Sequence, residues 1–222
     1  MKLSPSVRGA DPIRQQGLQT KVMAHSDSLT SSYKQAASAT LARSRAAIEK
    51  LVVPAASGVY AIYLRAHGLL SPFEVGEGGL IYIGCSTNLS DREFEQHFSS
   101  DKTGFSTLRR SIGALLKRQL ALRAIPRAPG ISETNVRNYR FADDDEARLT
   151  SWMCAHLEIA VHSSAKYPEL EDFLVSELQP LLNLTKWPNP DRAEIKRLRK
   201  VCADEARTAA RRISDRLGIR PG

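Results

Sequence analysis

Two short apolar segments, residues 58–64 (GVYAIYL) and 80–84 (LIYIG), constrain the fold of this chain most. Runs of this length, rich in β-branched and aromatic residues and bounded by glycine or proline, are typical of buried β-strands. The Gly- and Pro-containing stretch between them, residues 68–79, predicts a hairpin with a long connection. Residues 157–162 form a third run of the same kind. The sequence therefore predicts a small, central, mainly antiparallel three-stranded sheet.

Helical patterns surround these strands. Residues 30–51 are rich in Ala, Lys, Arg and Leu, which favour a helix. Residues 106–120 place Leu108, Ile112 and Leu116 on one apolar face. Further helices are expected over residues 87–98, 146–156, 168–178 and 191–217, with a short strand over 136–141. The predicted fold class is α/β, a sheet flanked by helices, with helical N- and C-terminal extensions.

The charge of the chain is basic and unevenly placed. Its 222 residues include 32 Lys and Arg against 24 Asp and Glu, a net charge of +8. Nine basic residues and one acid fall within 102–140, and both ends of the chain are also basic. We therefore divide the chain into a basic, partly disordered and partly helical N-terminal extension (1–54), a central domain (55–187) and a basic C-terminal helix (188–222). Nucleic acid is the expected partner, and the alternatives are an acidic membrane or a charge that only serves solubility.

Cysteine usage and hydropathy narrow the cellular setting. Cys85, Cys154 and Cys202 form no CxxC pair, which favours a reduced, intracellular protein without structural zinc. The N-terminus has no apolar signal region, and no apolar run approaches the ~18 residues of a membrane span. A cytoplasmic location without a membrane partner is expected.

An ordered set of residues connects the strands to chemistry. The set consists, in chain order, of Gly58-Val59-Tyr60, Tyr82-Ile83-Gly84, Arg92, Glu171 and Asn183. It resembles the GIY-YIG nuclease superfamily over about residues 58–183, with Gly58 and Gly84 as glycines of the two motifs. Two positions depart from the family pattern. The His that many members carry one turn after the Arg is Gln96 here, with His97 one residue later, and Cys85 stands where some members have Lys.

The resemblance implies a metal-dependent endonuclease that hydrolyses phosphodiester bonds in DNA. Glu171 would bind Mg²⁺ or Mn²⁺. Such an ion binds one or two protein carboxylates and takes its other ligands from water and the phosphate. Arg92 would stabilise the phosphate. Tyr60 would be the general base or would position the water, and Tyr82 would orient the water or phosphate. Asn183 would brace the site, and His97 is a further possible site residue.

The basic segment suggests how DNA is held. Arg109, Arg110, Lys117 and Arg118 lie mainly off the apolar face of the 106–120 helix, which makes them candidates for contacts with the phosphate backbone. The acidic run 143–146 is interpreted as a solvated turn and helix N-cap. The alternative function is a catalytically lapsed DNA- or RNA-binding protein on the same scaffold. The residues leave open an RNA-directed enzyme, and they leave open whether the chain forms a homodimer.

Overall fold

The computed structural model describes residues 28–90, 97–129 and 132–217, and its main sheet has four strands. Their order is β1 (Ala46–Ala47), β6 (Leu157–Ser163), β2 (Gly58–Leu64) and β3 (Leu80–Ser86), and each neighbouring pair is antiparallel. Every residue of the central strand β2 is buried. This explains why its sequence is continuously apolar rather than alternating. The α/β fold class and the antiparallel sheet are confirmed.

The predicted hairpin of β2 and β3 is present, and its register decides where the tyrosines lie. Tyr60 pairs with Gly84, and Ile62 pairs with Tyr82. Because side chains of directly paired residues share a face of the sheet, Tyr60 and Tyr82 lie on the same face as diagonal neighbours.

The expectation of three strands is wrong, because Ala46–Ala47 adds a fourth. The first helix, α1 (Ser31–Arg43), ends well before the predicted residue 51 and is followed by β1 and a short 3₁₀ helix, η1 (Ile48–Lys50). Ala46 pairs with Ile159 at the outer edge of β6. A two-residue strand contains no hydrophobic period, so nothing in the sequence distinguishes it from the end of a helix.

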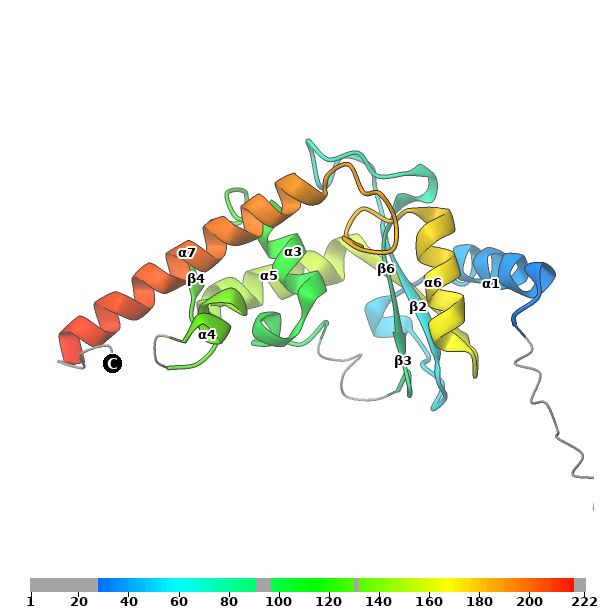
Figure 1. Cartoon of the computed structure of the whole chain (residues 1–222), viewed down its shortest axis with the longest axis horizontal. Helices are drawn as coiled ribbons and strands as arrows, with labels where there is room; N and C mark the ends of the chain where they lie inside the picture. Colours follow the sequence, from blue (N-terminus) through cyan, green and yellow to red (C-terminus); the bar gives the residue numbers. More distant parts are fainter. Residues whose placement is uncertain (1–27, 91–96, 130–131, 218–222) are drawn as a thin grey trace, which may run out of the picture.

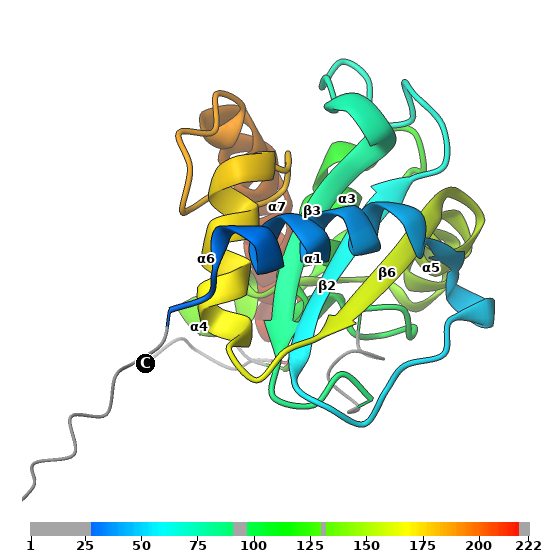
Figure 2. The ribbon, with the colours of Figure 1, turned by 90° about the vertical axis from the view of Figure 1, so that its right-hand side faces the viewer.

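Helices cover both faces of the sheet. On one face lie α1 and α6 (Tyr167–Leu178); in Figure 2, α1 crosses in front of the strands and α6 lies beside β3. Buried side chains of both helices meet those of β2, β3 and β6 there; they include Ala37, Leu41, Val59, Ala61, Tyr63, Ile83, Ala160, Leu170 and Leu174.

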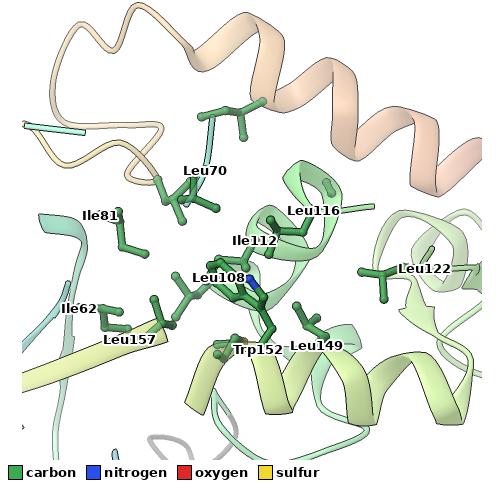
Figure 3. Packing of buried hydrophobic residues seen from close by; sticks show 14 of the residues in the cluster. Ile62, Leu70, Ile81, Leu108, Ile112, Leu116, Leu122, Leu149, Trp152 and Leu157 are labelled. Atoms are coloured by element: carbon green, nitrogen blue, oxygen red, sulfur yellow. The ribbon is translucent and has the colours of Figure 1, made fainter. Parts of the chain in front are cut away.

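The other face carries the larger core. It is covered by α3 (Thr107–Leu115), α5 (Asp143–His156) and α7 (Arg192–Leu217). Figure 3 shows Ile62 and Leu157 of the sheet facing Leu108 and Ile112 of α3. From this core α7 extends away from the sheet, packed along α3 and α4 (Glu133–Arg137) (Figure 1).

Several predicted boundaries change in this half. The helix that Ser106 caps ends at Leu115 rather than at residue 120, and a turn follows. The strand expected over 136–141 is instead α4 followed by β5 (Arg140–Phe141). β5 pairs with β4 (Ala124–Ile125) to form a separate two-stranded sheet. Short 3₁₀ helices η2 (Glu77–Gly79) and η3 (Thr103–Phe105) precede β3 and α3.

Some expectations fall outside the part of the chain that the structure describes. These are the N-terminal residues 1–27 and residues 91–96, half of the helix predicted over 87–98, including Arg92. Among the described helices, none combines the length and the apolar character that a membrane crossing requires.

Candidate active site

The two motif tyrosines meet on one face of the β2–β3 hairpin. Their ring centroids are 6.2 Å apart, and the rings are tilted by 39°. The phenol of Tyr60 lies across Gly84, and a Cβ added at Gly84 would collide with the Tyr60 hydroxyl. A Cβ at Gly58 would collide with the carbonyl oxygen of His162 on β6. The two motif glycines therefore give the Tyr60 ring and the β6 backbone the space they occupy.

The hydroxyl of Tyr60 is held by a short chain of hydrogen bonds. Its oxygen lies 2.8 Å from Nε2 of His97, and Nδ1 of His97 lies 2.7 Å from Oγ of Ser106. Ser106 is the N-cap of α3, and its Oγ accepts the backbone N–H of Arg109. The cap of one helix thereby orients the imidazole that contacts Tyr60.

Both ionisable groups of this hydrogen-bonded series, Tyr60 and His97, are neutral at pH 7. Burial, and then the charge of Arg109, lower the pKa of His97 to about 4. Burial also raises the pKa of Tyr60 well above 10, and Tyr82 and Cys85 add to the rise. The pKa of Tyr82 is raised by burial and then by the charge of Glu171. Neutral His97 can therefore share a proton with Tyr60 in either direction.

Glu171 of α6 contacts β3 at Cys85, which packs against the core on the α1 and α6 face of the sheet. Its Oε2 lies 2.5 Å from Nζ of Lys186 and accepts a hydrogen bond of 3.5 Å from the thiol of Cys85. The Lys186 ammonium also lies 2.5 Å from Oδ1 of Asp172. Burial lowers the pKa of Lys186, but its hydrogen bonds to Asp172 and Glu171 outweigh this, so the pKa is raised. One cation is thus held between two neighbouring carboxylates.

Asn183 connects this region to the edge of the sheet. Its side-chain oxygen accepts the N–H of Ile83 at 2.9 Å, and its NH₂ donates to the carbonyl of Ile83 at 2.8 Å. The N–H of Leu182 donates to the carbonyl of Ile81. These bonds pair the outer edge of β3 on both sides of Tyr82. Asn183 therefore positions the strand, and the segment that follows α6, relative to the two tyrosines.

The structure thus brings five of the predicted site residues to one part of the sheet: Tyr60, Tyr82, His97, Glu171 and Asn183. Arg92 lies outside the described residues. Among the described residues, no group of three or more His, Cys, Asp or Glu is arranged to hold a metal ion.

The expectation that Arg109 and Arg110 lie on an exposed, DNA-facing side of their helix is wrong. Both are buried, and the Arg109 guanidinium forms a 2.8 Å ion pair with Glu146, with both side chains inaccessible to solvent. Lys117 is half-buried and pairs with Glu205 at 2.7 Å, whereas Arg118 is exposed. A short helix between two packed layers has no wholly exposed face, so its charged side chains are buried and find partners.

The interpretation of the acidic run 143–146 as a solvated turn and helix N-cap is wrong for a similar reason. Ala142, not an acidic residue, is the N-cap of α5, and Asp145 and Glu146 are buried. Asp145 accepts the backbone N–H of Arg123 at 2.7 Å, and Glu146 accepts that of Phe141 at 2.9 Å. These carboxylates connect α5 to the small second sheet and are not a solvated turn.

Sequence reasoning missed two residues of the site. Lys186 lies three residues after Asn183 in an irregular segment, where no motif indicates that it contacts Glu171. Ser106 could have been found, since a serine just before an amphipathic helix indicates an N-cap. Its contact with His97 depends on how α3 packs against the sheet.

Comparison with known proteins adds an independent finding. No curated protein and no solved structure gives a significant match to the chain. The family model described as the GIY-YIG catalytic domain matches residues 58–201, well over half of the chain, and begins at Gly58 of the first motif. The matched span includes both tyrosines, Glu171, Asn183 and the first part of α7. The chain therefore belongs to the GIY-YIG nuclease superfamily, and its domain is of the nuclease type.

Proposed function

We propose that this protein is a metal-dependent endonuclease that hydrolyses phosphodiester bonds in DNA. One observation carries the proposal: Tyr60 and Tyr82 lie with their phenols together, and a carboxylate whose charge raises the pKa of both, Glu171, already holds a cation. Phosphodiester hydrolysis needs a positioned water and positive charge beside the phosphate. The two tyrosines can position the water, and Glu171 can bind the cation that supplies the positive charge.

The donor atoms at Glu171 suit Mg²⁺ or Mn²⁺. Such ions take one or two carboxylates and complete their shell with water and phosphate oxygens. Glu171, with Asp172 beside it, would hold the ion where the Lys186 ammonium now bridges the two carboxylates. When bound, the ion would polarise the phosphate and lower the pKa of an attacking water.

The residues of this chain would position and deprotonate that water. In our proposal Tyr60 donates its hydroxyl proton to Nε2 of His97 as its oxygen accepts one from the water. The water oxygen then forms the new bond to phosphorus as the bond to the leaving oxygen breaks, and the leaving oxygen takes a proton from solvent water. Tyr82 orients the water or the phosphate, Arg92 neutralises charge on the phosphate, and Asn183 keeps β3 in place.

A second candidate, a catalytically lapsed nucleic-acid-binding protein, is favoured by one contact. The ammonium of Lys186 occupies the carboxylate that the metal would need. If that ion pair persists in the presence of Mg²⁺, the protein would bind nucleic acid without cleaving it.

Nicking of supercoiled plasmid DNA tests the proposal. We expect cleavage with Mg²⁺, none with EDTA, and a loss of at least about 100-fold in Tyr60→Phe, the lower range for losing a general base. Tyr63→Phe is the matched control, because Tyr63 is buried on the opposite face of the same strand. Absence of nicking, or equal nicking by Tyr60→Phe and wild type, would contradict the proposed activity.

A further inference from the structure

A groove between α4 and α7 lies apart from the tyrosines and Glu171. Its volume is about 470 Å³, and its lining is almost entirely charged. The lining residues are Glu133, Arg137, Lys196, Arg199, Lys200, Ala203, Asp204 and Arg207. With a single apolar residue, Ala203, this groove lacks the anchors that a protein partner would bury.

The two acids of the groove neutralise only part of its positive charge. Arg207 pairs with Glu133 at 3.0 Å and with Asp204 at 2.6 Å, and Lys200 also pairs with Asp204. In the part of the chain that the structure describes, no carboxylate forms an ion pair with Arg137, Lys196 or Arg199. Three cations of the groove are therefore uncompensated.

A fourth cation, Arg110, is buried near Arg199 of the groove. It is 6% exposed, and its guanidinium donates to the backbone carbonyls of Thr103 and Gly104, while its Nε has no hydrogen-bond partner. Burial lowers the pKa of Arg110 to about 10, and the like charges of Arg199 and Arg127 contribute. Gathering like charges is costly unless an anion joins them.

The positive charge continues toward the active site. The Arg127 guanidinium lies over the ring of Phe105, 5.2 Å from its centroid, and Phe105 is 62% exposed. The next residue, Ser106, forms the hydrogen bond to His97, which contacts Tyr60. Phe105 therefore lies next in the chain to the residue that positions His97, and Arg127 contacts Phe105.

We propose that the basic stripe of Arg127, Arg199, Lys196 and Arg137 binds the phosphate backbone of the nucleic-acid substrate away from the bond that is cleaved. Arg137 and Lys196 are exposed and contact phosphates directly, Arg127 and Arg199 are half-buried, and the buried Arg110 adds charge near Arg199. The choice of nucleic acid rests on the proposed function. A bound polyanion would compensate the positive charge of the stripe, which no carboxylate of the protein neutralises in the described residues.

The test compares two double variants with equal loss of charge. Arg137→Gln/Lys196→Gln removes the exposed cations of the stripe from two different helices. Arg43→Gln/Lys50→Gln removes exposed cations of α1 and η1, which do not line the groove, and is the control. Binding of the full-length proteins to a fluorescent 30-base-pair duplex is measured in EDTA over a series of NaCl concentrations, so that cleavage plays no part.

For the stripe variant we expect affinity to fall at least about 10-fold and the slope of log Kobs against log [NaCl] to become shallower by about 2, near 0.9 for each lost phosphate contact. The control variant should stay close to wild type. Equal slopes in the two variants, or no duplex binding by wild type, would overturn the proposal. Displacement by poly-glutamate as effective as by duplex DNA would also overturn it, in favour of an acidic protein partner.

The result of this binding experiment is independent of the result of the nicking experiment. Binding with the expected change of slope, but without nicking in Mg²⁺, would contradict the endonuclease and leave the stripe supported. If both hold, the stripe variant should nick at the wild-type rate once DNA is saturating, since its substitutions lie outside the reacting groups.

Discussion

The phenol of Tyr60 and the imidazole of His97 share a hydrogen bond of 2.8 Å, although they lie 37 residues apart in the sequence. The other ring nitrogen of His97 contacts Ser106, the N-cap of α3. The first motif tyrosine is therefore tied to a helix on the larger core of the sheet. This contact gives His97 a place in the site, although its position in the sequence is one residue from that of the family His.

The lowered pKa of His97 predicts a stability that depends on pH. The unfolded chain takes up a proton on this His near pH 6.5, but the folded protein takes it up only near pH 4. The contribution of His97 to the free energy of unfolding is therefore fully present above pH 6.5 and is lost as the pH falls toward 4. The full loss is about 3 kcal/mol in the free energy of unfolding. Urea unfolding of wild type and His97→Asn at pH 7, 5.5 and 4.5 measures it.

In that series the difference in unfolding free energy between wild type and His97→Asn should shrink steadily as the pH falls. His67→Gln, a substitution at an exposed His, should follow wild type. A constant difference between wild type and His97→Asn at all three pH values would show that the His97 ring is not held neutral by its surroundings.

The buried ion pair of Arg109 and Glu146 predicts a strong coupling between α3 and α5. Removing one partner leaves an uncompensated buried charge, so Arg109→Met and Glu146→Leu should each lower the free energy of unfolding by about 3–5 kcal/mol. The double variant should be more stable than the sum of the two losses predicts, because it leaves no charge unpaired. Denaturant unfolding of all four proteins measures the coupling.

A solvent-exposed pair on α7 provides the comparison. Arg197 and Glu194 form a 2.6 Å ion pair with both side chains largely exposed. The same cycle there should show no measurable coupling. If Arg109 and Glu146 proved equally uncoupled, the burial assigned to them would be wrong, and Arg109 would again be available for contacts with DNA.

The thiol of Cys85 should react slowly despite its place beside the candidate active site. Burial, and then the charge of Glu171, raise its pKa to about 12, so very little thiolate exists at pH 7.5. Alkylation by iodoacetamide, followed by mass spectrometry of the Cys85 peptide, should be at least about 100-fold slower than for an unhindered cysteine. Glu171→Gln should speed it, because the carboxylate charge is removed. A rate equal to that of free cysteine would contradict the contact between Cys85 and Glu171.

The sequence predicts those parts of the fold that depend on local pattern. The strands β2, β3 and β6 are continuous apolar runs, and α6 has a proline in its first turn with acidic residues after it, so each has a local signal. The strand Ala46–Ala47 has none, because it forms only through pairing with β6.

The residues whose surroundings the sequence did not predict all have partners that are distant in the chain. Arg109 looks like a surface cation until Glu146, on another helix, is placed beside it. Lys186 gains its role only because the segment after α6 returns to Glu171. Helical periodicity assigns charged side chains to solvent, and it cannot indicate which of them will be buried with a partner.

The most direct test of the account is metal-dependent nicking by Glu171→Gln measured beside Glu177→Gln. Both carboxylates are on α6, but Glu171 lies against Cys85 and Lys186, whereas Glu177 is exposed near the other end of the helix. We predict that Glu171→Gln loses nicking of supercoiled plasmid in Mg²⁺ by at least about 100-fold, while Glu177→Gln retains it. Equal activity in the two variants would contradict a catalytic centre built around Glu171 and the two motif tyrosines.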